Sequence, residues 1–432
     1  MAFDLVVHAT TAHIDGATRE AWIGITDGRI AEISEGVLEG PLVTLAEDEV
    51  LIPGIVDTHV HVNEPGRTEW EGFASATRAA AAGGVTTIVD MPLNSIPATT
   101  TVEALAAKRA VATVSVDTGF WGGAVPQNLG ALRPLHEAGV FGFKAFLAPS
   151  GVPEFDHLNA EQLERALAEI ADLGSLLIVH AEDPGVLDAH ANHGGADYHA
   201  FVESRPDEAE VTAIERVIAG VRRTGARAHI LHLSSASALP ALRAARAEGL
   251  PITVETCPHY LTIAEEQIAD GATQFKCCPP IRDDANRDAL WRALLDGDID
   301  VVVTDHSPAT VELKTAGHGD FQVAWGGIAG LQTGFSAVWT EAARRGIPLE
   351  TVLGWMSRGP ADLVGLQQKG RIAVGADADL VAFAPEETFT VHAESLLHKN
   401  PVSAYEGRQL RGVARRVWVR GQAPGSGRLL QR

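Results

Sequence analysis

The sequence has few cysteines, few basic residues and no long hydrophobic run. Its three cysteines, Cys257, Cys277 and Cys278, are too few for a disulfide framework. Because no second pair stands at metal-ligand spacing, we interpret them as small buried hydrophobic residues. No stretch reaches the roughly eighteen apolar residues of a membrane-spanning helix. Segment 1–5 also lacks the basic and apolar regions of a signal peptide. We therefore expect a soluble cytoplasmic protein with no membrane partner.

Basic residues are scarce relative to acidic ones. The 34 Lys and Arg residues against 56 Asp and Glu residues give a formal net charge of −22. A surface of this sign repels phosphate backbones, so we expect no nucleic-acid partner. Hydrophobic residues make up 46% of the chain and charged residues 21%, with 43 Gly and 22 Pro. This composition is typical of a loop-rich globular enzyme and not of a disordered chain.

Both ends of the chain have the pattern of β-structure. Near the N-terminus, short apolar runs flank the turn Asp27-Gly28, which predicts a hairpin. Segments 375–382 and 416–419 near the C-terminus have the same character. We predict one small β-domain built from residues 1–50 and 366–432, beside a larger domain at 51–365.

Strand and helix patterns alternate through the middle of the chain. One predicted helix starts near Pro206 and stops at Gly220. Eight strand candidates each end in polar residues, which predicts an α/β fold with a closed parallel (β/α)8 barrel. These candidates are 50–62, 85–91, 115–121, 140–147, 176–182, 227–234, 252–258 and 299–305.

A His-x-His pair ends the first of these strands. Strand side chains alternate between two faces, so His59 and His61 point the same way. By itself such a pair is more often two ordinary hydrogen-bonded residues than a metal site. Its position at the C-terminal end of a barrel strand favours the metal site, because barrel active sites form there.

Further polar side chains stand at the same end of four other strands. Each alone could be structural, as a hydrogen-bonded core histidine or as a lysine whose ammonium reaches solvent. Their occurrence at equivalent strand ends predicts one shared metal site. They are Lys144, His180, His232 and Asp305, on the fourth, fifth, sixth and eighth strands.

Lys144 differs in charge from the other predicted ligands. A free ammonium beside metal ions has a lowered pKa and does not bind metal. Four neutral imidazoles and one aspartate also carry too little negative charge for two divalent ions. Carboxylation of Lys144 would remove the positive charge and supply a bridging oxyanion.

The residues Pro53-Gly54-x-x-Asp57-x-His59-x-His61 and the later ligands together resemble the amidohydrolase superfamily, in its cyclic-amidase branch. The resemblance covers essentially the whole chain. It implies that His59, His61 and Asp305 bind one metal, that His180 and His232 bind the second, and that carboxylated Lys144 bridges the two. It also implies a TIM-like barrel, a β-sandwich from both termini, and a homotetramer. Such sites accept Zn²⁺, Co²⁺, Mn²⁺ or Fe²⁺, with zinc expected first.

The chemistry expected of such a site is hydrolysis of a cyclic amide. Two metals about 3.5–4 Å apart acidify a bridging water and polarise the ring carbonyl. Asp305 is the predicted catalytic residue, which takes the proton of the water and delivers it to the leaving nitrogen. His306 should point away from the site, because side chains alternate along the strand.

Three positions argue against a substrate that carries a carboxylate. Dihydroorotases that resemble this chain bind a carboxylate with an Arg, an Asn and a His, where this chain has Asn63, Cys278 and Ala309. We therefore expect a small neutral cyclic ureide, with Asn63, Cys278 and Ser307 as substrate contacts. The segments that instead resemble allantoinases, which convert allantoin to allantoate in purine degradation, are 61–73, 276–282, 305–308 and 325–332.

Several roles stay open at this point. Arg67 either binds the ureido group or orders its loop, and Glu64 either contacts substrate or pins the same loop. Tyr260 and Trp325 are interpreted as packing residues. The alternative activities are those of a hydantoinase (dihydropyrimidinase) or a dihydroorotase-like cyclic amidase. A non-catalytic scaffold with the same fold is the alternative from another class, although such chains typically lose metal ligands.

Overall fold

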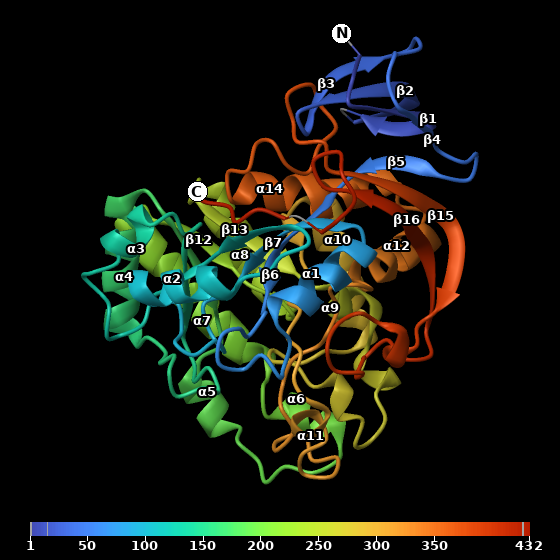
Figure 1. The fold of residues 1–432 in the computed structure, drawn as a ribbon. Coiled ribbons are helices and arrows are strands. Elements are labelled where there is room, and N and C mark those ends of the chain that lie inside the picture. Colours follow the sequence, from blue (N-terminus) through green and yellow to red (C-terminus); the bar gives the residue numbers. More distant parts are fainter. Residues whose placement is uncertain (1, 15, 426) are drawn as a thin grey trace.

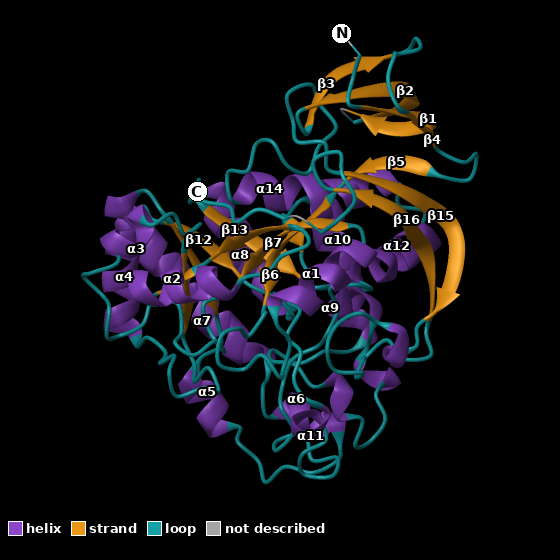
Figure 2. Ribbon diagram, viewed as in Figure 1, coloured by secondary structure: helices purple, strands orange, loops and turns teal. Residues whose placement is uncertain are grey.

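A computed structural model describes residues 2–14, 16–425 and 427–432 of the chain. Its main body is a ring of parallel strands surrounded by helices, and a β-rich domain projects from one side (Figure 1). Helices cover the barrel strands, whereas the projecting part consists of strands and loops (Figure 2). The predicted α/β barrel with a β-rich domain from both chain ends is confirmed.

The barrel strands follow one another around a closed ring. They are β6 (Ile55–Val60), β7 (Val85–Asp90), β8 (Asp117–Phe120), β9 (Gly122–Gly123), β10 (Phe143–Phe146), β11 (Leu176–His180), β12 (Arg227–Ile230), β13 (Ile252–Thr256) and β14 (Val301–Val302). Parallel pairing joins β6, β7 and β8, and joins β9 through β14 in order. The ring closes where Val60 bridges His306 and the His61 amide donates to the His306 carbonyl at 2.7 Å.

Helices follow the barrel strands along the chain. The first four are α1 (Phe73–Ala82), α2 (Val102–Val111), α3 (Arg133–Glu137) and α4 (Ala160–Leu173). The next six are α5 (Pro184–Ala189), α6 (Tyr198–Glu203), α7 (Asp207–Thr224), α8 (Leu239–Ala247), α9 (Pro258–Thr262) and α10 (Asp284–Asp296). The last are α11 (Val311–Lys314), α12 (Gly334–Arg344), α13 (Leu349–Leu353), a π-helical turn (Gly354–Arg358) and α14 (Gly359–Leu363).

The long helix α7 passes the end predicted for it at Gly220. It continues to Thr224, so the predicted stop is wrong. A Cβ atom at Gly220 would lie 2.4 Å from Cδ1 of Leu167 on α4. The glycine therefore allows α7 to pack closely on α4, and it does not end the helix.

The β-rich domain contains strands from both ends of the chain. They are β1 (Leu5–Ile14), β2 (Ala17–Thr26), β3 (Arg29–Ser34), β4 (Leu42–Thr44), β5 (Val50–Pro53), β15 (Leu380–Thr390) and β16 (Gln409–Trp418). They form one seven-stranded sheet in the order β16-β15-β5-β1-β2-β3, with β4 paired to β1. The predicted hairpin at Asp27-Gly28 is confirmed, because β2 and β3 pair antiparallel. Val7, Ile23 and Leu380 belong to a core cluster separate from that of the barrel.

The first predicted barrel strand, residues 50–62, contains two strands that belong to different sheets. β5 pairs with β1 and β15, whereas β6 pairs with β7. Gly54 lies between them, where its amide donates to the Asp379 carbonyl at 2.9 Å and its carbonyl accepts from Ser357 Oγ at 2.6 Å. The prediction of a single strand was wrong because the apolar pattern continues unbroken while the pairing partner changes.

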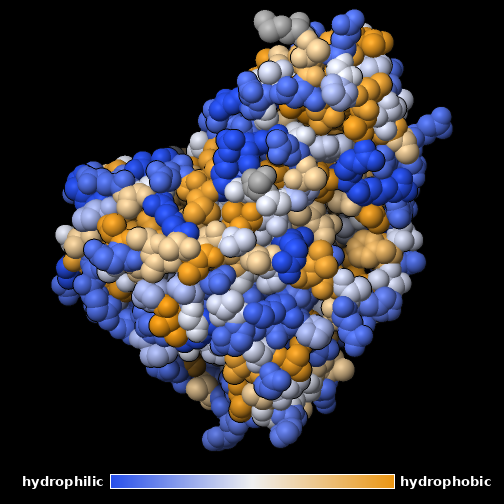
Figure 3. Space-filling view, viewed as in Figure 1, coloured by the Kyte–Doolittle hydropathy of each residue, from blue (hydrophilic) through white to orange (hydrophobic). Residues whose placement is uncertain are grey.

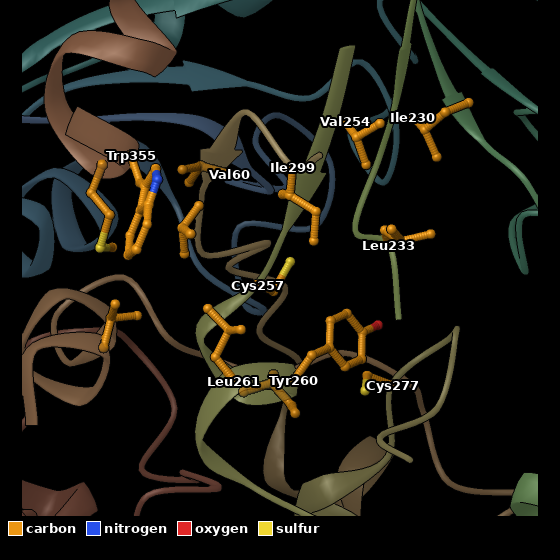
Figure 4. Close-up of a cluster of buried hydrophobic side chains, with 14 of the residues drawn as sticks. Val60, Ile230, Leu233, Val254, Cys257, Tyr260, Leu261, Cys277, Ile299 and Trp355 are labelled. Atoms are coloured by element: carbon orange, nitrogen blue, oxygen red, sulfur yellow. The ribbon is translucent and has the colours of Figure 1, made fainter. Parts of the chain in front are cut away.

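Two of the three cysteines are buried in the barrel core. Cys257 and Cys277 lie among apolar side chains such as Leu261 and Val254 (Figure 4). Both thiols are free and buried, as the sequence predicts, whereas Cys278 is half-buried. The outer face in Figure 3 mixes hydrophilic and hydrophobic side chains, and hydrophobic ones also gather over the terminal sheet. No helix in the described ranges is long and apolar enough to cross a membrane.

We predict that Gly54→Ala destabilises the protein. A Cβ atom at Gly54 would lie 2.0 Å from Oγ1 and 2.5 Å from Cγ2 of Thr86, which is buried and β-branched and cannot turn aside. The expected loss is about 1–3 kcal/mol of unfolding free energy, measured by denaturant or thermal unfolding. Gly354→Ala is the matched control, because a Cβ atom there meets nothing within 4 Å. Equal unfolding midpoints for the two variants would contradict the close approach at Gly54.

Candidate metal centre

Six polar side chains meet at the C-terminal mouth of the barrel. They lie within β6, β10 and β11, or one to three residues after the ends of β6, β12 and β14. Each is at most 9% exposed. The structure thus brings together all six predicted metal ligands, which are His59, His61, Lys144, His180, His232 and Asp305.

One part of the centre gathers around Asp305. Its Oδ1 lies 3.0 Å from Nε2 of His59 and 3.5 Å from Nε2 of His61. Nζ of Lys144 lies 3.4 Å from the same His59 nitrogen. The ligand atoms of the two histidines and the aspartate all lie within 4.8 Å of one another. Imidazole nitrogens and a carboxylate oxygen at this spacing are donors that divalent transition metals prefer.

The other part pairs His180 with His232. Nδ1 of His180 faces Nε2 of His232 at 3.0 Å. The ring of Phe146 stacks on His180 with centroids 4.6 Å apart and an interplanar angle of 19°. Nδ1 of His232 is buried and has no hydrogen-bond partner among the described residues. Two ring nitrogens that face each other need a shared proton or a shared cation, so a metal ion fits here as well.

Glu255 on β13 orients the ligands of the first part. It accepts a hydrogen bond from Nδ1 of His59 at 2.5 Å, from Nε2 of His229 at 2.9 Å and from the His232 amide at 3.1 Å. An ionised carboxylate only accepts, so His59 carries its proton on Nδ1 and turns Nε2 toward Asp305. Such outer contacts fix the orientation of metal-binding histidines. No local pattern in the sequence sets Glu255 apart, so it was not among the predicted site residues.

Glu182 has the same relation to His180. It lies two residues beyond His180 and accepts a hydrogen bond from Nε2 at 2.8 Å, which leaves Nδ1 of His180 directed at His232. Arg205 donates to both oxygens of Glu182, from Nε at 3.0 Å and from Nη2 at 2.5 Å. Only the folded chain brings Arg205 to Glu182, so the sequence alone does not predict this pair.

The charges of the centre depend strongly on burial. Burial alone would lower the pKa of His59, but Asp305 and Glu255 outweigh it and raise the pKa to about 9. Burial and the nearby Lys144 lower the pKa of His61 to about 3. Burial also lowers the pKa values of His180 and His232, so their rings are neutral and able to bind metal at pH 7.

The backbone is unusual at the same place. His232 and Asp305 have φ angles of 37° and 45°, and Asn63 and Asn94 both have φ of 66°. Residues other than glycine seldom adopt this left-handed conformation, and in folded proteins it is often found at functional sites. Here it turns two of the six predicted ligands at the points where their strands end.

A cavity of about 380 Å³ opens onto the centre. Of the predicted ligands, all except His59 line it. Its wall also includes Cys278 and Ser307, two of the three predicted substrate contacts, together with the segment 324–327. A larger cavity of about 510 Å³, next to Pro53 and the π-helical turn, includes none of the predicted ligands.

Asn63, the third predicted contact, lies behind the wall of the cavity. It is 1% exposed, and its Nδ2 donates to the Pro308 carbonyl at 3.3 Å. Its Oδ1 has no hydrogen-bond partner among the residues that the structure describes. Asn94, Arg205 and Gln322 line the cavity instead and were missed, because no local pattern in the sequence sets them apart.

The residues with open roles lie mostly outside the cavity. Arg67 donates to the Asn94 carbonyl at 2.7 Å and pairs with Glu154, so it orders the loops around the mouth. Glu64 accepts the Phe73 amide at 2.8 Å at the start of α1. The Tyr260 hydroxyl donates to the Pro279 carbonyl at 2.7 Å inside the core, so its packing role is supported.

Trp325 differs from these residues because it lines the cavity. Its ring meets that of Trp70 edge-on, with centroids 4.9 Å apart. It therefore packs against the mouth loop and also forms part of the wall. His306, by contrast, is fully buried and directed at Glu71, at 3.4 Å, so it points away from the centre as predicted.

A second cluster of acidic residues could also attract a metal ion. It consists of Asp117, Asp377 and Asp379. Nζ of Lys369 lies 2.6, 2.9 and 2.7 Å from these three carboxylates, and Arg420 also contacts Asp117. A lysine thus already occupies this cluster, whereas the ligand atoms of the first centre face one another.

Known proteins resemble the chain over nearly its whole length. A family model described as "Amidohydrolase family" matches residues 50–423. An allantoinase of Streptomyces avermitilis is 57% identical over 424 residues, which are 97% of this chain and 95% of that protein. An allantoinase of Saccharomyces cerevisiae is 45% identical and covers 95% of this chain and 92% of its own. A solved structure of L-hydantoinase (dihydropyrimidinase) from Arthrobacter aurescens has a TM-score of 0.93 at 31% identity and covers 100% of both chains.

We predict that added Zn²⁺ stabilises the folded protein by binding to the centre formed by the six predicted ligands. A ligand that binds only the folded state adds about 2.7 kcal/mol at a free concentration 100 times its Kd, so the melting temperature should rise. Asp305→Asn should reduce the rise in a thermal-unfolding titration, because it removes one predicted ligand while His180 and His232 remain. Asp377→Asn is the control and should keep it, because Lys369 already neutralises that cluster. A full rise in Asp305→Asn, or its loss in Asp377→Asn, would place the metal elsewhere.

Proposed function

The chain belongs to the amidohydrolase family, and from that premise we propose that it is an allantoinase, which opens the ring of allantoin to give allantoate. The observation that carries this conclusion is the 57% identity to an allantoinase over 97% of the chain. The second relative, at 45% identity, has the same name. The polar cavity above the six ligands is a suitable place for a small cyclic ureide.

Bound metal ions and Asp305 have different roles in the proposed hydrolysis. Bound divalent ions supply acidification of water and polarisation of the ring carbonyl. Burial alone would raise the pKa of Asp305, but His59 and His61 outweigh it and hold the pKa well below its usual range. Asp305 is therefore ionised and accepts one proton from the attacking water. It returns this proton to the ring nitrogen as the C–N bond breaks, while the water oxygen stays on the carbonyl carbon.

The proposal includes two metal ions per chain, with zinc first and cobalt, manganese or iron as alternatives. The grouping of ligands supports it: His59, His61 and Asp305 form one set, and His180 and His232 form the other. Lys144 lies 3.4 Å from His59 and contacts the Phe146 ring, which in turn stacks on His180, so it stands between the two sets.

Lys144 is proposed to be carboxylated and to bridge the metals. A neutral amine is the form that combines with carbon dioxide, and burial lowers the pKa of Lys144 from 10.5 to about 8. At pH 7 a group with a pKa of 8 is neutral in about 10% of molecules, against about 0.03% at a pKa of 10.5. Burial of Lys144 thus favours its carboxylation, which would also replace its positive charge by the negative charge that two metal ions require.

The proposed substrate contacts are Cys278 and Ser307 in the cavity wall and Asn63 behind it. We further propose a cytoplasmic homotetramer. The free cysteines fit a reducing compartment. The exposed hydrophobic residues Val37, in the loop before β4, and Leu42, at the start of β4, offer a surface for subunit contact.

A comparison of substrates tests the proposed activity. Allantoin should give the highest kcat/KM among allantoin, hydantoin, dihydrouracil and dihydroorotate at saturating Zn²⁺. Dihydroorotate should be the poorest, because its carboxylate meets no clamp at Asn63, Cys278 and Ala309. Hydantoin as the best substrate would favour the activity of the structural relative. No ring opening together with less than one metal per chain would support a scaffold.

A second prediction concerns Lys144. Lys144→Ala should lose metal and activity together, and acetate or propionate should partly restore both by replacing the bridging oxyanion. His180→Ala removes an imidazole instead and should not respond to these acids. Full activity of Lys144→Ala would remove the residue from the centre.

The lowered pKa of Lys144 also predicts how metal-stripped protein recovers. Carboxylation needs the neutral amine, whose fraction grows as the pH rises through about 8. Recovery with Zn²⁺, at bicarbonate concentrations chosen to give the same dissolved carbon dioxide at both pH values, should therefore be faster at pH 8.5 than at pH 6.5. Recovery that is independent of bicarbonate would count against the carboxylated form.

A further inference from the structure

Arg205 connects the cavity wall with the metal centre. It lies in the short link between α6 and α7 and contributes to the wall. Its Nε and Nη2 donate to the two oxygens of Glu182, which accepts a third hydrogen bond from Nε2 of His180. A fork of two hydrogen bonds fixes a carboxylate in orientation as well as in position. Through Glu182, the guanidinium thereby fixes the orientation of the His180 ring, which faces the predicted metal position.

The contacts around Glu182 leave little room for another arrangement. Glu182 is fully buried, and Arg205 is its cationic partner. A buried carboxylate that loses its cation is strongly destabilised and tends to move or to take up a proton. Either change would disturb the hydrogen bond that keeps Nδ1 of His180 free of a proton. Phe146 holds the plane of the same ring, and Glu182 fixes its rotation within that plane.

One nitrogen of the Arg205 guanidinium remains after these contacts. Within residues 2–14, 16–425 and 427–432, no group accepts a hydrogen bond from Nη1. The side chain is 20% exposed and lies in the cavity wall. Lys276 in the same wall differs, because its Nζ donates to the Ala324 carbonyl at 2.6 Å and to the Gln322 carbonyl at 3.3 Å. Arg205 therefore offers a ligand a charged donor that protein groups do not use.

On the basis of the proposed function, we propose that Arg205 has two roles in the reaction. As a positioning residue it holds the metal ligand His180 through Glu182. As a substrate-binding residue it donates from Nη1 to a carbonyl oxygen of the bound ureide. Because Glu182 already balances its charge, Arg205 binds a neutral carbonyl without the need for an anionic ligand.

Substitution of Arg205 separates the two roles. Arg205→Gln removes the cation and the fork, so Zn²⁺ affinity should fall by about 10- to 100-fold. At saturating Zn²⁺ its KM for allantoin should rise by at least about 10-fold, the expected effect of losing a charged hydrogen bond. Arg205→Lys keeps one cationic nitrogen for Glu182 but has none left for the ligand. Its Zn²⁺ affinity should fall less than that of Arg205→Gln, because the charge of Glu182 stays balanced although the fork is lost, while its KM rises as in Arg205→Gln.

Arg216→Gln is the matched control. Arg216 pairs with Asp183, the neighbour of Glu182, at 2.6 Å and does not line the cavity. Its loss should change neither Zn²⁺ affinity nor KM. Zn²⁺ affinity is measured by competition with a chelator in the absence of substrate, and KM from initial rates.

Each role can be overturned separately. Unchanged Zn²⁺ affinity in Arg205→Gln would overturn the positioning role, and unchanged KM in Arg205→Lys would overturn the binding role. Should Arg205→Gln fail to fold, weakened Zn²⁺ binding together with raised KM in Arg205→Lys would support the proposal, and unchanged Zn²⁺ affinity there would count against the positioning role. If the unchanged protein does not open allantoin, the proposed function fails, while the affinity comparison still tests the positioning role. KM is then measured on the best substrate found.

Discussion

The Glu255 carboxylate is the group on which the order of the metal centre depends. It accepts hydrogen bonds from the rings of His59 and His229 and from the His232 amide, so it joins β6, β12 and β13 at one point. A buried carboxylate is tolerated only while its hydrogen-bond partners are in place. Because the partners of Glu255 belong to neighbouring strands, a shift of one strand relative to the others would cost free energy. The same contacts turn Nε2 of His59 toward Asp305. The arrangement of the strands and the preparation of the ligands therefore rest on one side chain.

The two halves of the centre are built on the same principle. In each, a buried carboxylate accepts a hydrogen bond from one ring nitrogen of a histidine, so that the other ring nitrogen is directed into the centre. Glu255 is the acceptor for His59, and Glu182 is the acceptor for His180. The carboxylates differ in what balances their charge. Glu182 has the guanidinium of Arg205, whereas the ion-pair partners of Glu255 among the described residues are His59 and His229. A divalent cation bound by His59, His61 and Asp305 would balance the negative charge of the nearby carboxylates. Without a cation, the balancing positive charge lies on His59, whose pKa is raised to about 9.

Much of this architecture follows from local patterns in the sequence, and the remainder depends on pairs that only folding creates. Alternation along a strand and the shared end of parallel strands are sufficient to predict the barrel and to bring six ligands to one mouth. Glu255 could not be predicted, because its importance lies in a contact with His59, 196 positions away. Asn63 shows the opposite limit: it stands two residues after His61, but a φ of 66° and a hydrogen bond to Pro308 accompany its place behind the cavity wall. The change of sheet at Gly54 is equally invisible in an unbroken apolar run.

The choice of a neutral substrate rests on how the cations of the cavity wall are compensated. The wall contains Arg205 and Lys276, so a count of charges alone would suggest a site for an anion. Arg205 is balanced by Glu182, and Lys276 is held by main-chain carbonyls. A ligand carboxylate would lose its hydration to meet one cation that is already paired with a carboxylate and another that is already hydrogen-bonded to the main chain, whereas a ureide gives up less hydration and can exchange hydrogen bonds with polar groups there. The substitutions at Asn63, Cys278 and Ala309 are therefore only part of the reason. Arg205 is paired with Glu182 and Lys276 already has main-chain acceptors, and this arrangement favours ligands whose recognition needs donors and acceptors more than charge.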